Sequence, residues 1–124
     1  MIYNIENEFL KVSVDTMGAQ LWSVYSKKTN TEYLWQGDPA FWGGRAYNLF
    51  PFIGRMYEGK FSYDGKDYPS RCHGLARYLE FTLESQTENE LVFLLTDSEE
   101  TKAEYPFSWA ALSQIEVYGN YIKE

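Results

Sequence analysis

The sequence predicts an all-β fold made of antiparallel strands. Residues 9–15 alternate between apolar and polar side chains, a pattern typical of a strand with one buried face. Two turn-forming pairs, Asp64-Gly65 and Gly119-Asn120, each lie between strand-like runs, where such pairs favour tight hairpins. Aromatic residues, which are enriched in strands, make up 19% of the chain. Together these observations indicate sheets whose neighbouring strands are joined by short turns.

The strands are expected one after another, each bounded by polar or turn-forming residues. The expected ranges are 9–15, 20–26, 32–35, 60–63, 66–68, 81–85, 91–96, 107–118 and 121–124. Residues 36–49 lose the alternating pattern, and we expect a long aromatic loop that packs over one end of the sheets or lines a cleft. Asp97 or Ser98 is expected to cap a short helix that continues to Ala103 and ends before Tyr105-Pro106.

The composition argues against several classes of partner. A formal net charge of −7 and an isoelectric point near 4.7 would repel the phosphates of nucleic acids. The single cysteine, Cys72, excludes an internal disulfide and fits a reducing compartment. One cysteine and one histidine are too few for the usual zinc sites, so no metal is expected. The N-terminus lacks signal-peptide features and no apolar run could span a bilayer, which predicts a cytoplasmic protein without membrane contact.

Residues 50–77 contain the strongest candidates for a functional site. The Asp64-Gly65 hairpin is expected to bring Arg55, which precedes it, close to His73, which follows it. Arginine donates hydrogen bonds and histidine donates or accepts them, so the pair suits a ligand rich in hydroxyl groups. The same residues also fit a structural role, because lone histidines commonly lie at the surface or in structural hydrogen bonds. If the segment is extended, Cys72 and His73 point to opposite faces, which disfavours a Cys/His catalytic pair.

Six short motifs follow one another along most of the chain. They are FPFIGR at residues 50–55, GKF at 59–61, the Asp64-Gly65 turn, HGLAR at 73–77, DSEET at 97–101 and YPF at 105–107. Together they resemble the N-terminal part of the aldose 1-epimerase family, and in particular its LacX-like galactose mutarotase homologues. The resemblance implies a galactose mutarotase-like antiparallel β-sandwich with a sugar bound in an open cleft. Residues 1–124 are expected to form a single partial domain of this kind.

The resemblance also implies a reaction, the interconversion of the α and β anomers of free aldoses. A base takes the proton of the anomeric hydroxyl while an acid protonates the ring oxygen, and the ring opens. No cofactor is implied, because neither electrons nor phosphate groups move. Arg55 resembles the family's substrate-binding arginine, and His73 resembles its first active-site histidine, which hydrogen-bonds the sugar near the ring oxygen. Trp42 and Arg77 are further candidates for the lining of the cleft.

The family's proton-transfer residues have no counterpart in this sequence. The family's general acid is a second histidine and its general base is a glutamate near the end of a much longer chain, whereas this sequence has one histidine and ends within the second hairpin. We therefore expect a truncated aldose 1-epimerase-like protein that binds a monosaccharide and is inactive as an isolated chain. Two alternatives stay open: a non-catalytic carbohydrate-binding or interaction module, and one half of a split enzyme. Open sheet edges would favour self-association or a complementing chain.

Overall fold

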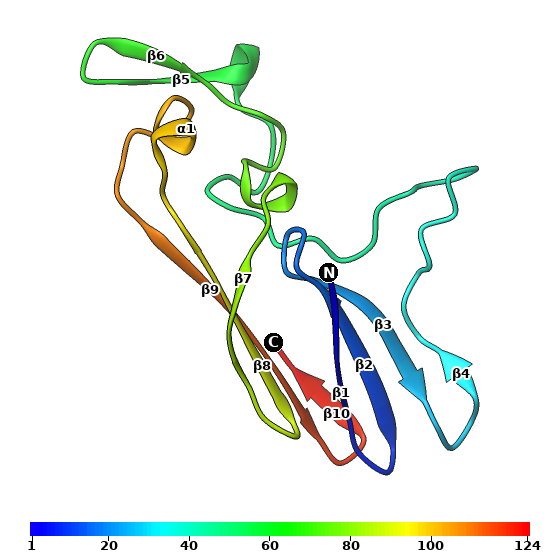
Figure 1. Ribbon diagram of the computed structural model, residues 1–124. Helices are drawn as coiled ribbons and strands as arrows, with labels where there is room; N and C mark the ends of the chain where they lie inside the picture. The colour runs from blue at the N-terminus through cyan, green and yellow to red at the C-terminus, as the bar shows by residue number, and fades with distance from the viewer.

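Two four-stranded antiparallel sheets make up most of the molecule in the computed structural model, which describes residues 1–124 (Figure 1). The first sheet contains, in chain order, β1 (Ile2–Glu6), β2 (Leu10–Asp15), β3 (Gln20–Ser26) and β4 (Thr31–Glu32). The second contains β7 (Thr82–Gln86), β8 (Glu90–Thr96), β9 (Ala110–Tyr118) and β10 (Tyr121–Lys123), each beside the next. The predicted all-β antiparallel fold is confirmed.

A separate hairpin and three short helical turns complete the chain. The hairpin consists of β5 (Lys60–Tyr63) and β6 (Lys66–Pro69). The only α-helix is α1 (Glu99–Lys102), and 3-10 turns lie at Tyr57–Gly59 and Ala76–Tyr78. No helix in the structure is both long enough and apolar enough to cross a membrane.

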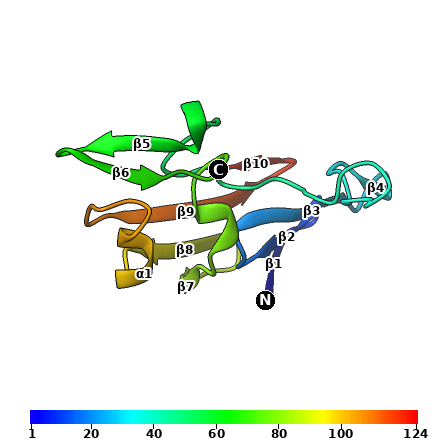
Figure 2. The same ribbon diagram turned by 90° about the horizontal axis from the view of Figure 1, so that it is seen from above.

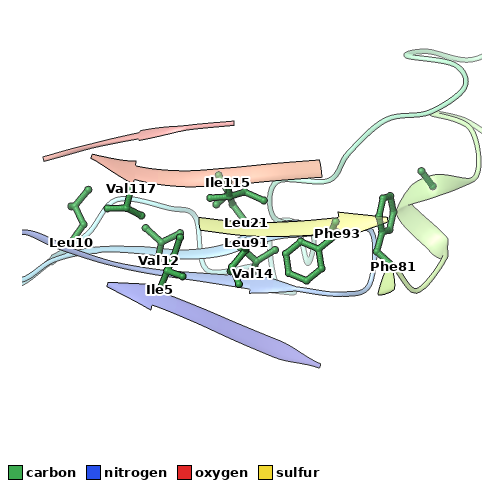
Figure 3. Close-up of a cluster of buried hydrophobic side chains, with 12 residues drawn as sticks. Ile5, Leu10, Val12, Val14, Leu21, Phe81, Leu91, Phe93, Ile115 and Val117 are labelled. Carbon is green, nitrogen blue, oxygen red and sulfur yellow. The ribbon is translucent and has the colours of Figure 1, made fainter. Parts of the chain in front are cut away.

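The two sheets pack face to face over one hydrophobic core. Val12 and Val14 of β2 lie against Leu91 and Phe93 of β8 and Ile115 of β9 (Figure 3). All five side chains are fully buried. Because successive side chains of a strand point to opposite faces, each sheet buries one face in this core and leaves the other to solvent. The architecture is therefore a β-sandwich.

The first strand, β1, was not among the predicted ones. It pairs with β2 over its whole length, from Ile2 opposite Asp15 onward. Its inward face carries Ile5, which is 3% exposed, and Tyr3, whose ring packs edge-on against Phe93 at 5.8 Å between centroids. In the sequence, these two residues alternate with polar residues as a strand would require. The pattern repeats only once, which is too short to predict a strand.

The third strand was predicted at residues 32–35, but β4 ends at Glu32. The Glu32 carboxylate accepts hydrogen bonds from the N–H groups of Val24 and Leu34, at 2.8 and 2.9 Å. These bonds use backbone donors that would otherwise serve sheet pairing, so the ladder stops. Burial would raise the pKa of Glu32, but hydrogen bonds from Ser23 and from the two amides outweigh it and hold the pKa below its ordinary value.

The long strand predicted at residues 107–118 begins at Ala110. Asp97 follows β8 directly, and its carboxylate accepts the N–H of Trp109 at 3.0 Å. This bond, together with Lys102 at 3.2 Å, lowers the pKa of Asp97. Beyond Asp97 the chain turns into α1, where Ser98 is the N-cap, as one of the two predicted alternatives. Residues 107–109 therefore have no β8 residue to pair with.

The β5–β6 hairpin lies apart from the sandwich, beside α1 and the start of β9 at one end of the molecule (Figures 1 and 2). Aromatic contacts attach it there. Tyr63 packs on Phe107 with 4.8 Å between ring centroids, and Phe61 contacts both Phe52 at 5.3 Å and Tyr105 at 6.3 Å. This aromatic cluster supports the segment that contains the candidate site, because Phe52 belongs to residues 50–55.

Candidate functional site

Two loop segments, residues 50–55 and 71–76, lie side by side and form the candidate site. The carbonyl of Phe50 accepts hydrogen bonds from the N–H groups of Leu75 and Ala76, at 2.8 and 3.1 Å. Phe50 also forms a parallel bridge with Gly74. The β5–β6 hairpin connects the two segments, so they come together at its base (Figure 1).

A left-handed turn places His73 next to the first segment. His73 and Gly74 have φ angles of 68° and 74°. A Cβ atom added to Gly74 would overlap the carbonyl of Phe50, so this position requires glycine. The N–H of His73 donates to the carbonyl of Gly54 at 3.0 Å. Because Gly54 directly precedes Arg55, this bond holds the backbone of His73 beside the segment that contains Arg55. The structure thus brings together the two segments that the sequence pointed to.

The imidazole of His73 is held by the same segment as its backbone. Its Nδ1 lies in hydrogen-bond contact with the carbonyl of Ile53. The side chain is half-buried. Cys72 and His73 lie in a turn rather than in an extended segment, so the expectation that their side chains point to opposite faces does not apply.

Arg55 lines an open surface cavity of about 470 Å³ together with Ser70 and Cys72. Its side chain is exposed and forms no ion pair with a carboxylate of the chain. The hydroxyl oxygen of Ser70 is buried and has no hydrogen-bond partner. The cavity therefore offers a free guanidinium, which can donate hydrogen bonds to ligand oxygens.

An ion pair anchors the second segment from its other side. Arg71 donates two hydrogen bonds to the Glu104 carboxylate, from Nε at 2.8 Å and from a terminal nitrogen at 2.7 Å. Glu104 lies between α1 and β9, so the pair ties the turn of His73 to the second sheet. Two-point contacts of this kind fix orientation as well as distance. Neither residue was among the site residues predicted from the sequence.

Trp42 and Arg77 both contact a third residue, Tyr47. The Arg77 guanidinium lies 4.2 Å from the centre of the Tyr47 ring, and Trp42 packs edge-on against the same ring at 6.5 Å. Trp42 is 52% exposed, whereas Nε of Arg77 is buried without a hydrogen-bond partner. Tyr78 links this cluster to the His73 turn, since its ring contacts both Arg77 at 5.0 Å and Arg71 at 4.8 Å.

Sequence reasoning missed Tyr47, Tyr78 and the Arg71–Glu104 pair. One cation–π contact joins Tyr47 of the aromatic loop to Arg77, and two more join Tyr78 to arginines on either side of His73. No local pattern indicates which ring meets which arginine. The one available signal was the proximity of Arg71, Arg77 and Tyr78 to His73 in the sequence. Trp42 and Arg77 lie in one cluster through Tyr47, whereas Arg55 and His73 belong to the two paired loop segments.

The sandwich and the paired loops define the class of protein. The structure superimposes on a galactose mutarotase related enzyme from Lactobacillus acidophilus with a TM-score of 0.96 and 38% identity, over 98% of this chain. A galactose mutarotase-like protein from Lactobacillus casei gives a TM-score of 0.95 and 30% identity over the same share of the chain. The fold is thus the galactose mutarotase-like antiparallel β-sandwich.

The chain belongs to the aldose 1-epimerase family, because the model of that family matches residues 1–121. The chromosomal LacX protein of Lactococcus lactis subsp. lactis is 37% identical over 114 residues, which are 88% of this chain. The predicted family membership and the similarity to LacX are confirmed. The chain spans 38% of that LacX protein and 41% of the L. acidophilus enzyme, so it corresponds to about two fifths of its relatives' length.

Proposed function

We propose that this chain provides the sugar-binding part of an aldose 1-epimerase-like site, in which Arg55 and His73 hydrogen-bond a free aldose. The observation that carries the proposal is the docking of the His73 turn onto residues 50–55, which brings the backbone of His73 beside the segment that contains Arg55. Residues 1–124 would then act as one part of an aldose 1-epimerase domain. Membership of the family supports this assignment of ligand class.

The proposed reaction of the whole domain is the interconversion of α and β aldose anomers. It needs a base at the anomeric hydroxyl and an acid at the ring oxygen. His73 is the only histidine of the chain, and its ring is bonded to the Ile53 carbonyl. We therefore assign His73 to sugar binding and place the proton-transfer pair outside these 124 residues.

Titration calorimetry with galactose and glucose tests the binding. We expect saturable heat at millimolar sugar that Arg55→Ala abolishes and Arg55→Lys weakens, since lysine keeps the charge but loses the fork of donors. Lys11→Ala, an exposed cation on β2 far along the chain from the site, is the matched control and should bind as the wild type does. Absence of heat in the wild-type chain would contradict the proposal.

Polarimetry of freshly dissolved α-galactose tests the assignment of roles. General acid and general base each contribute about 10²–10⁴ to such reactions, so the chain alone should leave the rate of anomerisation at that of the buffer. A faster rate that His73→Ala removes would show that His73 itself transfers protons, contrary to the assignment.

We further propose a cytoplasmic location and association through open sheet edges. The free Cys72 thiol supports a reducing compartment. Each sheet has two outermost strands, β1 and β4 in the first and β7 and β10 in the second, and each of them has one unpaired edge that another strand could extend. The partner would be a second copy of the chain or a complementing polypeptide of the same family.

A further inference from the structure

The chain from Ser70 to His73 is bonded to the first loop segment and the hairpin base only at its two ends. The N–H of Ser70 donates to the carbonyl of Gly59 at 2.8 Å, and the N–H of His73 donates to the carbonyl of Gly54 at 3.0 Å. The N–H groups of the two residues between them donate to no backbone carbonyl. The position of this short span therefore depends on its side chains.

The side chain of Arg71 supplies the missing link. Its guanidinium donates two hydrogen bonds to the Glu104 carboxylate and lies 4.8 Å from the centre of the Tyr78 ring. Glu104 is itself held at the end of α1, because its N–H donates to the carbonyl of Thr101 at 3.1 Å. Thr101 also forms the capping box with Ser98 that begins this helix. A two-point contact with a carboxylate held in this way fixes the orientation of the span as well as its distance.

Both sequence neighbours of Arg71 line the cavity that contains Arg55. Ser70 and Cys72 belong to its lining, whereas Arg71 does not. The guanidinium therefore holds this wall of the cavity from outside it. The ion pair is also partly exposed, 43% at Arg71 and 28% at Glu104, and exposed pairs add little to the stability of a fold.

We propose that Arg71 is a positioning residue for the cavity of Arg55. Through Glu104 it holds the neighbouring wall in the place that sugar binding needs. The inference rests on the proposed function for the identity of the ligand. It differs in sign from the alternative that Arg71 contacts the sugar itself. Loss of the Glu104 charge would free the guanidinium for such a contact and strengthen binding, whereas loss of a positioning bond weakens it.

The affinity of Glu104→Gln for galactose separates these two roles. Glutamine keeps the length of the side chain and one acceptor oxygen, but it loses the charge-assisted two-point contact. In an NMR titration we expect the affinity to fall about tenfold, the effect of one hydrogen bond. Arg71→Lys, which keeps the charge and a single-point contact, should lose less. The exchanged pair, Arg71→Glu with Glu104→Arg, should recover most of the wild-type affinity.

Glu100→Gln is the matched control, because it removes the same charge from an exposed position in the first turn of α1. It should bind galactose as the wild type does. The urea midpoint of Glu104→Gln should stay close to that of Glu100→Gln, so that a loss of affinity does not reflect unfolding. Glu104→Gln binding as tightly as the wild type or more tightly, or an exchanged pair that binds no better than Glu104→Gln, would overturn the positioning role.

The thiol of Cys72 reports on the cavity wall without any ligand. Cys72 is the only cysteine of the chain and is partly buried. Its alkylation by uncharged iodoacetamide, followed across the range around about pH 8.5 in which free thiols ionise, gives the rate of the thiolate itself. We expect this rate to rise severalfold in Glu104→Gln and to return to the wild-type rate in the exchanged pair.

An unchanged alkylation rate in Glu104→Gln would overturn the inference whether or not sugar binds. Failure of the proposed function gives a different result. A wild-type chain that binds no sugar, but whose Cys72 responds to Glu104→Gln as expected, would overturn the proposed ligand and support the positioning of the wall by Arg71.

Discussion

At the scale of single residues, the candidate site requires glycine at position 74. Its φ of 74° and the closeness of the Phe50 carbonyl leave no room for a Cβ atom. The adjacent His73 also adopts a left-handed φ without being glycine, which costs about 1 kcal/mol or more. The backbone bonds to Phe50 and Gly54 hold this conformation in place.

We predict that Gly74→Ala lowers the free energy of unfolding by about 1–3 kcal/mol and abolishes sugar binding, because the turn must move away from Phe50. Urea denaturation and calorimetry measure the two effects. Gly54→Ala is the control for stability, since a Cβ atom there meets no other atom and its φ is not left-handed. Equal stability of the two variants would contradict the steric argument.

The sequence predicted part of this site for a physical reason. The Asp64-Gly65 pair has φ angles of 49° and 74°, as a tight hairpin turn needs, and a hairpin necessarily returns the chain to its starting point. The meeting of residues 50–55 with residues 71–76 could therefore be predicted from the sequence. The contacts of Tyr47 with Arg77 could not, because they connect the irregular aromatic loop to a turn thirty residues later and no periodicity relates them.

At the scale of elements, the sequence predicted the ends of strands where the apolar/polar alternation stops. It did not predict strand ends where a side chain hydrogen-bonds to the backbone. The ranges of β2, β3, β5 and β8 agree with the predicted ones to within a residue. By contrast, β4 and β9 are shortened where Glu32 and Asp97 bind backbone N–H groups. The sequence does not show which backbone amide a carboxylate at a strand end will bind.

The role of Asp97 predicts a dependence of stability on pH. Its folded pKa is depressed below the ordinary value of 3.8, first by the Trp109 N–H and then by Lys102. A depressed carboxyl pKa stabilises the fold above the unfolded pKa, and this contribution is lost as the pH falls through the folded pKa. Asp97→Asn should therefore be less stable than the wild type above about pH 5, with the difference shrinking below about pH 3.8.

Urea midpoints measured across this range test the expectation. Asp64→Asn is the matched control, because Asp64 is exposed in the hairpin turn, its carboxylate forms no ion pair, and asparagine suits the same turn. The difference in urea midpoint between Asp64→Asn and the wild type should not change with pH. If the difference in urea midpoint between Asp97→Asn and the wild type also stays constant with pH, the Asp97 charge does not stabilise the connection from β8 through α1 to β9.

At the scale of the whole molecule, the sandwich is closed by its core but open along its edges. The fully buried side chains of β2, β8 and β9 join the two sheets. Asn7, in the turn between β1 and β2, also donates to the carbonyl of Gly119, in the turn between β9 and β10, at 2.8 Å. Beside β10, however, an apolar cavity of about 450 Å³ opens between the sheets. Phe9, Tyr33 and Tyr121 line it, and Tyr33 and Tyr121 are 65% and 60% exposed.

This apolar cavity and the unpaired edge of β10 lead us to predict that the chain self-associates there. A second strand beside β10 would satisfy free backbone groups and cover the exposed rings of Tyr33 and Tyr121. A lysine at the edge should oppose this pairing, so Tyr121→Lys should raise the dissociation constant at least about tenfold in sedimentation velocity.

Tyr57→Lys makes the same change at a side chain that is 86% exposed and lies outside the cavity, and it should associate as the wild type does. A wild-type chain that stays monomeric across the micromolar range, or equal weakening by both substitutions, would place the association elsewhere or exclude it.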